Sequence, residues 1–144
     1  MIYARFQNVD VTVDESSDGD ELYWRAENAG QRYAHLIEHI QDAVVEFELV
    51  DGTSVIRSVN EAFVDIFGYA REDVVDEPLN ETIVPAWLRE EAQALDDRTR
   101  AGEINYQRVR RETAVGLREF LYRGIPYADD DTVTDGFAVY TDLT

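Results

Sequence analysis

The 144-residue chain contains no cysteine and, because all thirteen of its basic residues are arginine, no lysine. The lack of cysteine excludes disulfides, thiolate catalysis, cysteine-ligated metals and any thiol-linked chromophore. Long apolar runs are also missing: no stretch approaches the roughly 20 residues that span a bilayer, and no charged-then-apolar leader opens the sequence. We therefore expect no membrane segment here and a cytoplasmic location.

Positive charge is scarce as well, and the formal net charge is −18. Such a surface repels nucleic-acid phosphates, so we expect no nucleic-acid partner. Self-repulsion of this size is screened in molar salt, where the Debye length is about 3 Å. The composition is typical of halophilic proteins.

The length suits one domain with a hydrophobic core. Residues 1–27 are interpreted as an N-terminal extension, in which Ile2–Val13 could form a strand before an acidic linker rich in Ser and Gly. Residues 28–144 form the predicted domain.

Periodicity predicts the first half of that domain. A helix is expected from about Asn28, with an apolar stripe that includes Leu36 and Ile40. Alternation then predicts two strands over Val44–Val59, joined by a tight turn at Asp51-Gly52. Asn60 is a good N-cap for a short helix that Gly68 ends.

Short helical pieces are predicted around Arg71–Val75 and Asn80–Val84, and a longer helix over Ala86–Ala101. Three more strands are predicted, at Ile104–Glu112, Leu117–Ile125 and Val133–Asp142. The order of elements indicates an α+β fold with one antiparallel sheet and helices covering a single face. The last strands carry apolar residues on both faces, so the second face should be covered by the N-terminal helix, another subunit, or both.

The order and spacing of several short motifs resemble a family. Asn60-Glu61-Ala62-Phe63, Phe67-Gly68-Tyr69, Pro85 before the long helix and the closing Asp142-Leu143-Thr144 are similar to those of PAS domains. The resemblance covers about Gln31 to Thr144. It is strongest to PAS modules of haloarchaeal signal-transduction proteins of the HTR-like and bacterio-opsin-activator types.

The resemblance implies a five-stranded antiparallel sheet of order 2-1-5-4-3, with helices enclosing a pocket on one face and a flanking N-terminal helix. It implies a sensor in signal transduction, such as a two-component system, that forms a homodimer through the N-terminal helix and outer sheet face and relays to a downstream effector. The structural and signalling motif positions are Asn60, Gly68, Asp142 and Thr144. No catalytic arrangement is recognisable, so we expect no enzyme.

Candidate pocket residues should lie between the helices and the sheet. They are Phe63, Phe67, Ile83, Val84, Trp87, Leu88, Leu95, Tyr106, Tyr122 and Val139. Two interpretations stay open: apolar walls with a few polar groups could hold a small organic ligand, or the same side chains could simply fill the core of a ligand-free interaction and dimerisation domain.

The cofactor is unknown. Haem-binding relatives use a His on the helix that here spans Ala86–Ala101, and flavin photoreceptors use a Cys; this chain has neither, which leaves a non-covalent small molecule. His35 and His39 are spaced to share a metal, but a solvated helix face explains them better, so no metal site is assigned.

Arginines cluster on two predicted strands: Arg108, Arg110, Arg111, Arg118 and Arg123. They could recognise an anionic ligand or an acidic partner. Cross-strand pairing with Glu103, Glu112 and Glu119 is the interpretation we favour.

Overall fold

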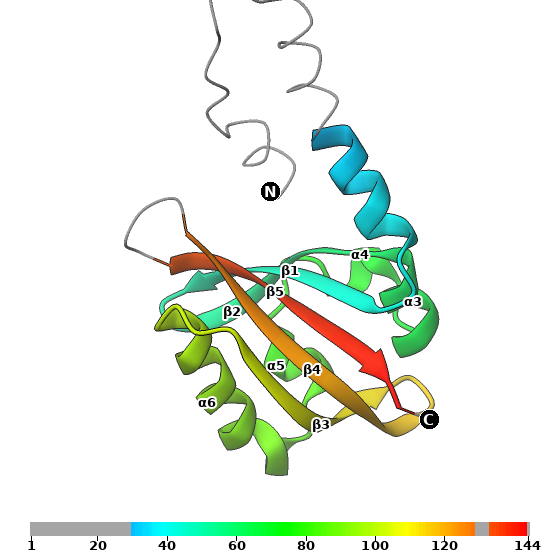
Figure 1. Ribbon diagram of the computed structural model, residues 1–144. Coiled ribbons are helices and arrows are strands. Elements are labelled where there is room, and N and C mark those ends of the chain that lie inside the picture. The colour runs from blue at the N-terminus through cyan, green and yellow to red at the C-terminus, as the bar shows by residue number, and fades with distance from the viewer. Residues whose placement is uncertain (1–29, 129–132, 144) are drawn as a thin grey trace, which may run out of the picture.

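The computed structural model describes residues 30–128 and 133–143 (Figure 1). The predicted strand Ile2–Val13, the acidic linker and the motif residue Thr144 lie outside the described residues.

Five strands form one antiparallel sheet of order β2-β1-β5-β4-β3, as expected. The strands are β1 (Ala43–Val50), β2 (Thr53–Val59), β3 (Asn105–Thr113), β4 (Gly116–Ala128) and β5 (Val133–Asp142). The predicted hairpin is confirmed: Asp51 and Gly52 both have positive φ, 52° and 81°, the geometry that matches the twist of the flanking strands.

Helices follow the first hairpin and lie together on one face of the sheet (Figure 1). They are α3 (Glu61–Phe67), α4 (Arg71–Val74), α5 (Leu79–Ile83), the 3-10 turn η1 (Ala86–Leu88) and α6 (Arg89–Arg100). One expectation needs correction, because Ala86–Ala101 is not one continuous α-helix. The backbone of Leu88, with ψ of 1°, departs from α-helical geometry and separates η1 from α6.

The hydrophobic core fills the space between these helices and the sheet. Phe67 stacks on Phe63 and Phe120 at centroid distances of 4.6 and 4.9 Å, and its edge meets Tyr140 at 5.5 Å. Alternation along β4 and β5 directs Phe120, Tyr122 and Tyr140 into this layer, where all are buried. Packed aromatic rings rather than a cavity therefore occupy the centre of the domain.

Residues 30–39 form the N-terminal helix, which extends away from the sheet beside the start of β1 (Figure 1). Its last turns lie near the sheet face opposite the core helices. There Ala34 and Ile37 line a groove together with Val44 of β1. Within the described ranges, no helix combines the length and the apolar character needed to cross a membrane.

Candidate functional site

Most of the predicted pocket residues lie in the core, packed against one another. The buried ones are Phe63, Phe67, Ile83, Val84, Leu88, Leu95 and Tyr122. Of these, only Leu95 and Tyr122 border unfilled interior space between α5, α6 and the sheet.

The other three predicted pocket residues lie elsewhere. Trp87 is 63% exposed, because the η1 turn directs its ring outward, where the Arg110 guanidinium covers it at 4.8 Å. Tyr106 is 64% exposed, and Val139 is half-buried on the sheet face opposite the helices. Both have the wrong strand parity for the interior, since their neighbours Asn105 and Tyr140 are the ones that point inward.

The space between these elements is nowhere wide enough for a water molecule. Its lining mixes apolar and polar side chains: Leu79, Asn80, Ala92, Leu95, Asp96, Arg111, Tyr122 and Tyr140. It therefore falls far short of the roughly 300 Å³ that ligand pockets usually measure. The interior here is a narrow, partly polar-lined gap.

A buried carboxylate lies beside that gap. Asp96 on α6 accepts two hydrogen bonds at Oδ2, from Ser54 Oγ of β2 and from Asn80 Nδ2 of α5, each 2.9 Å long. Burial raises the pKa of the Asp96 carboxyl to about 6, although both hydrogen bonds and the charge of Arg111 lower it. Asp96 therefore titrates in a range where ordinary aspartates are already ionised.

The tyrosines of the gap keep their protons. Burial raises the pKa of Tyr140 to about 12 and that of Tyr122 well above its ordinary value. Both hydroxyls are thus neutral at physiological pH. They can donate or accept hydrogen bonds but carry no charge.

Arg111 is the cation of this cluster and is only 2% exposed. Its Nη1 donates to the Arg110 carbonyl oxygen at 2.8 Å, and its charge lowers the pKa of the nearby Tyr140 hydroxyl. Glu91 Oε1 lies 3.8 Å from Nη1, beyond hydrogen-bond distance. In the described part of the chain Arg111 Nε has no hydrogen-bond partner.

Sequence reasoning did not single out Asp96, and it treated Arg111 as one of a surface group. For each residue, its position in the sequence pattern would have predicted burial. Asp96 follows Ala92 by four residues, on the apolar stripe of its helix, and Arg111 shares strand parity with the buried Val109 and Thr113. Polar residues at core positions are the pattern that marks such a cluster.

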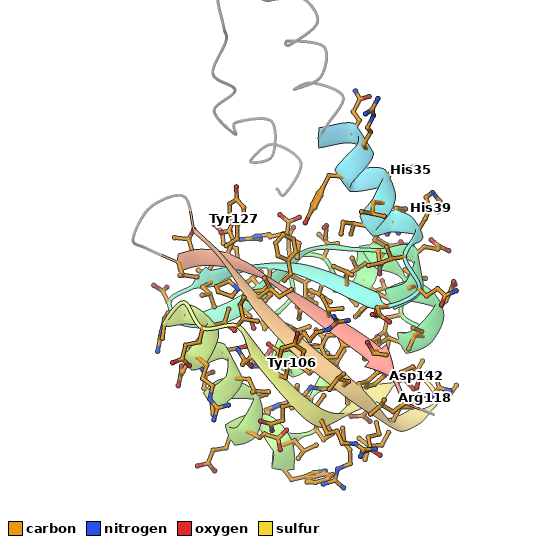
Figure 2. The ribbon with its side chains drawn as sticks, viewed as in Figure 1. His35, His39, Tyr106, Arg118, Tyr127 and Asp142 are labelled. Atoms are coloured by element: carbon orange, nitrogen blue, oxygen red, sulfur yellow. The ribbon has the colours of Figure 1, made fainter. Side chains whose placement is uncertain are left out.

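Three of the remaining arginines of that group pair with carboxylates, but only one of these partners, Glu119, is a predicted one. Arg108 contacts Glu119 at 2.7 Å across the β3–β4 ladder. Arg123 contacts Asp42 at 3.0 Å. Arg118 contacts Asp142 at 3.1 Å, and Figure 2 shows these two side chains together near the end of β5. Pairing therefore accounts for most of the cluster, while Arg110 contacts Trp87.

Asn60 joins three elements through its buried amide. Its Nδ2 donates to the carbonyl oxygens of Ile37 and Asp42 at 2.8 and 2.9 Å. Its Oδ1 accepts from the backbone N–H of Val44 at 2.9 Å and of Phe63 at 3.0 Å. The N-cap of α3 is thus also the link between the N-terminal helix and β1.

Gly68 ends α3 in the left-handed conformation, with φ of 79°. A Cβ at this position would come within 2.9 Å of the Ala114 Cβ, so the β3–β4 turn packs directly on the helix end. Glycine is required here on both conformational and steric grounds.

The groove on the opposite side of the sheet lies between the N-terminal helix, β1, β2 and α4. Its two arginines are internally paired: Arg57 with Glu48 and Asp76, both at 2.7 Å, and Arg71 with Glu38 at 2.8 Å. These pairs hold α4 to the hairpin and to the N-terminal helix.

His35 and His39 are exposed neighbours on the N-terminal helix, with ring centroids 4.3 Å apart (Figure 2). Across the described residues, no three His, Asp or Glu side chains gather in a way that could hold a metal ion.

An antiparallel sheet of order 2-1-5-4-3, with helices on one face and an asparagine linking the flanking helix to the core, defines an α+β module. The family model described as PAS domain matches residues 31–106, just over half of the chain. The chain belongs to the PAS domain family.

Solved structures share this fold at low sequence identity. The PAS domain of an HTR-like protein from Haloarcula marismortui aligns with a TM-score of 0.67 and 17% identity, covering 86% of this chain and 99% of its own. A PAS domain from Colwellia psychrerythraea aligns with a TM-score of 0.67 and 17% identity, covering 79% and 96%.

A third relative, the PAS domain of the Cronobacter turicensis RpfR quorum-sensing receptor in complex with BDSF, aligns with a TM-score of 0.62 and 15% identity, covering 75% and 99%. At these identities the similarity establishes the fold. A comparison with curated proteins found no match.

Proposed function

We propose that this PAS module signals through protein contacts, forming a homodimer through the N-terminal helix and the outer sheet face and relaying its state to a downstream effector. This role is sensory rather than catalytic. It corresponds to the filled-core interpretation of the sequence.

The outer face of the sheet is the observation that carries the proposal. Leu121 and Ile125 of β4, with Phe137 and Val139 of β5, have the parity that faces away from the core helices. On the N-terminal helix, Leu36 is 60% exposed. Neighbouring apolar side chains on an outer surface are typical of protein interaction sites.

The filled, narrow interior favours protein contacts over an organic ligand. The BDSF complex of the Cronobacter domain supports ligand binding as a property that this fold can host. In this chain aromatic rings fill the space between the helices and the sheet, and Trp87, a candidate for binding a ligand, lies outside it. A ligand of ordinary size would have to displace α6 or a ring of the Phe67 stack.

A signal would pass by biasing two arrangements of the flanking helix and the sheet, which requires a stimulus that favours one of them. Asn60 supplies a rigid connection for this purpose. Because it bonds Ile37, Val44 and Phe63 together, a shift of the core helices reaches the N-terminal helix directly.

Sedimentation equilibrium in molar salt tests the proposal. The wild-type chain should dimerise, and Leu121→Glu should weaken association at least about tenfold by placing a charge at the interface. The matched control is Val115→Glu, which introduces the same charge at an 88% exposed turn position and should leave association unchanged. A wild-type protein that stays monomeric at millimolar concentration contradicts the proposal.

Native mass spectrometry of the same protein tests the filled core. We expect the mass of the polypeptide alone. A co-purifying organic molecule, displaced by a bulky substitution such as Ala92→Phe beside the gap, would instead establish the ligand-binding version.

A further inference from the structure

The two edges of the sheet differ in how their backbone is covered. At the β2 edge, the Ile56 N–H donates to the Glu77 carbonyl oxygen at 2.9 Å, and the Ile56 carbonyl oxygen accepts from the Asp76 N–H at 2.7 Å. Pro78 forms a bridge with Val55 beside them. β3 is the other edge (Figure 1), and within the described residues no segment pairs with its outer side. An uncovered edge is where a sheet can accept a further strand.

The register shows which residues of β3 turn their backbone to this edge. The Leu143 N–H donates to the Glu119 carbonyl oxygen at 3.1 Å, so the backbone groups of Glu119 point toward β5 and away from β3. Arg110 lies opposite Glu119, and opposed residues of an antiparallel pair exchange both hydrogen bonds or neither. The N–H and C=O of Arg110 therefore face outward, and alternation gives Tyr106 and Arg108 the same orientation.

Side chains cover only part of this edge. Arg111 Nη1 donates to the Arg110 carbonyl oxygen at 2.8 Å, and the Tyr69 hydroxyl donates to that of Glu112 at 3.2 Å. In the part of the chain that the structure describes, the outward N–H and C=O groups of Tyr106 and Arg108 have no such partner. The open stretch thus extends from Tyr106 to the N–H of Arg110.

The charge of the edge is opposite to that of the protein. The net charge is −18, yet Arg108 and Arg110 are both exposed on the outer side of β3. Arg108 is paired with Glu119, whereas Arg110 has no carboxylate partner among the described residues. Its guanidinium is held over the Trp87 ring at 4.8 Å, which leaves its N–H groups available to a carboxylate.

We propose that the free edge of β3 binds an extended acidic segment of a partner protein, which adds to the sheet as a sixth strand. Its backbone would bond Tyr106 and Arg108, and its carboxylates would contact Arg108 and Arg110 as cross-strand neighbours. The inference goes beyond the proposed homodimer, which uses the N-terminal helix and the outer face of β4 and β5.

The partner's side chains follow from the same geometry. An added strand alternates its residues between the outer face, where the arginines lie, and the side of the helices, where Trp87 is exposed. A segment that alternates acidic and apolar residues fits both sides. A second copy of β3 fits less well, because a symmetric antiparallel pairing centred on Arg108 or Val109 would oppose arginine to arginine.

The test uses a short capped peptide in which valine and glutamate alternate, added to the full chain in molar salt. Hydrogen exchange followed by NMR should show the Tyr106 and Arg108 N–H groups protected about tenfold at a peptide concentration about nine times its Kd, with β2 unchanged. The same peptide with glutamine for glutamate should bind at least about fivefold more weakly, and a lysine version more weakly still.

N-methylation of the peptide tests the backbone bonds. Methyl groups on one alternate set of residues block the N–H groups that face β3 and should abolish binding, whereas methyl groups on the other set should be tolerated. Equal affinities of the two methylated peptides would overturn strand addition. Protection of Tyr106 and Arg108 that rises with protein concentration in the absence of peptide would instead identify a second copy as the occupant.

Two variants test the edge from the side of the protein. Arg110→Glu should weaken binding of the glutamate peptide at least about tenfold. Arg71→Glu makes the same change of charge on α4, which packs on β2 at the opposite edge, and should leave binding unchanged. Tyr106→Pro removes an outward N–H that the β3–β4 ladder does not use, so it should abolish binding while thermal unfolding shows a folded domain.

An absence of binding at millimolar peptide, or equal effects of Arg110→Glu and Arg71→Glu, would contradict the proposal. Sedimentation equilibrium of Arg110→Glu should match that of the wild type. The strand-addition site and the homodimer can therefore fail separately.

Discussion

Replacing Asn60 with alanine should destabilise the domain more than almost any other single polar substitution. The side chain makes four hydrogen bonds with backbone groups and is almost fully buried. At about 1 kcal/mol for each buried bond, the loss amounts to about 4 kcal/mol. Water can reach the freed groups only if the N-terminal helix or α3 separates from β1.

A second substitution separates the loss of stability due to the Asn60 Oδ1 bonds from that due to the Nδ2 bonds. Asn60→Asp keeps an oxygen that accepts from Val44 and Phe63 but loses the donor to Ile37 and Asp42, whose carbonyl oxygens then face a carboxylate. We expect at least about 2 kcal/mol of destabilisation. Hydrogen exchange should increase in the N-terminal helix more than in α3.

Urea denaturation in a fixed salt concentration, followed by far-UV circular dichroism, measures these losses. Gln93→Ala is the control: this exposed side chain bonds the Gly52 carbonyl at 3.3 Å, and its loss should cost less than about 0.5 kcal/mol. The reasoning is refuted if Asn60→Ala loses less than about 1 kcal/mol with an unchanged denaturant slope.

Further predictions concern the core, the surface and pH. Phe67→Ala should cost about 3–5 kcal/mol, since it removes the centre of the aromatic stack, as thermal or urea unfolding will show. Gly68→Ala should cost about 1–2 kcal/mol by the same measurement, because its Cβ meets Ala114 in a left-handed backbone. Trp87→Ala, at an exposed position, should change stability by no more than about 1 kcal/mol. The favourable contribution of protonated Asp96 is complete below pH 3.8 and is lost as the pH rises through about 6. Wild type should therefore lose roughly 3 kcal/mol relative to Asp96→Asn over that range, and parallel pH profiles of the two proteins would contradict this.

Local signals in the sequence were sufficient to predict the elements of the fold. Asp51-Gly52 predicts a hairpin because those residues accept positive φ, and Asn60 and Gly68 predict the ends of α3 because they satisfy its terminal backbone groups. Each effect acts within a few residues. The break at Leu88 was not predicted, since no residue type there announces a change from 3-10 to α geometry.

Placement of the candidate site was less predictable. Three apolar or aromatic candidates lie outside the interior: Trp87, Tyr106 and Val139. Every helix or strand has positions that face away from the core, and such positions can hold apolar residues too. Composition alone does not reveal which of the two alternating sets of strand residues faces the core. The helix and strand periodicities place Asp96 and Arg111 at inward-facing positions. Their burial was not predicted, because charged residues usually prefer solvent.

The sequence by itself determined the order of helices and strands, the turns between them, the family and the exclusion of cysteine-based chemistry, because these depend on residue type and on neighbours along the chain. Only the tertiary structure decided that aromatic rings fill the core and that Asp96, Ser54, Asn80 and Arg111 share one gap. Those four residues come from separate elements. Their chemistry arises from a shared, water-excluding environment that exists only when the helices pack on the sheet.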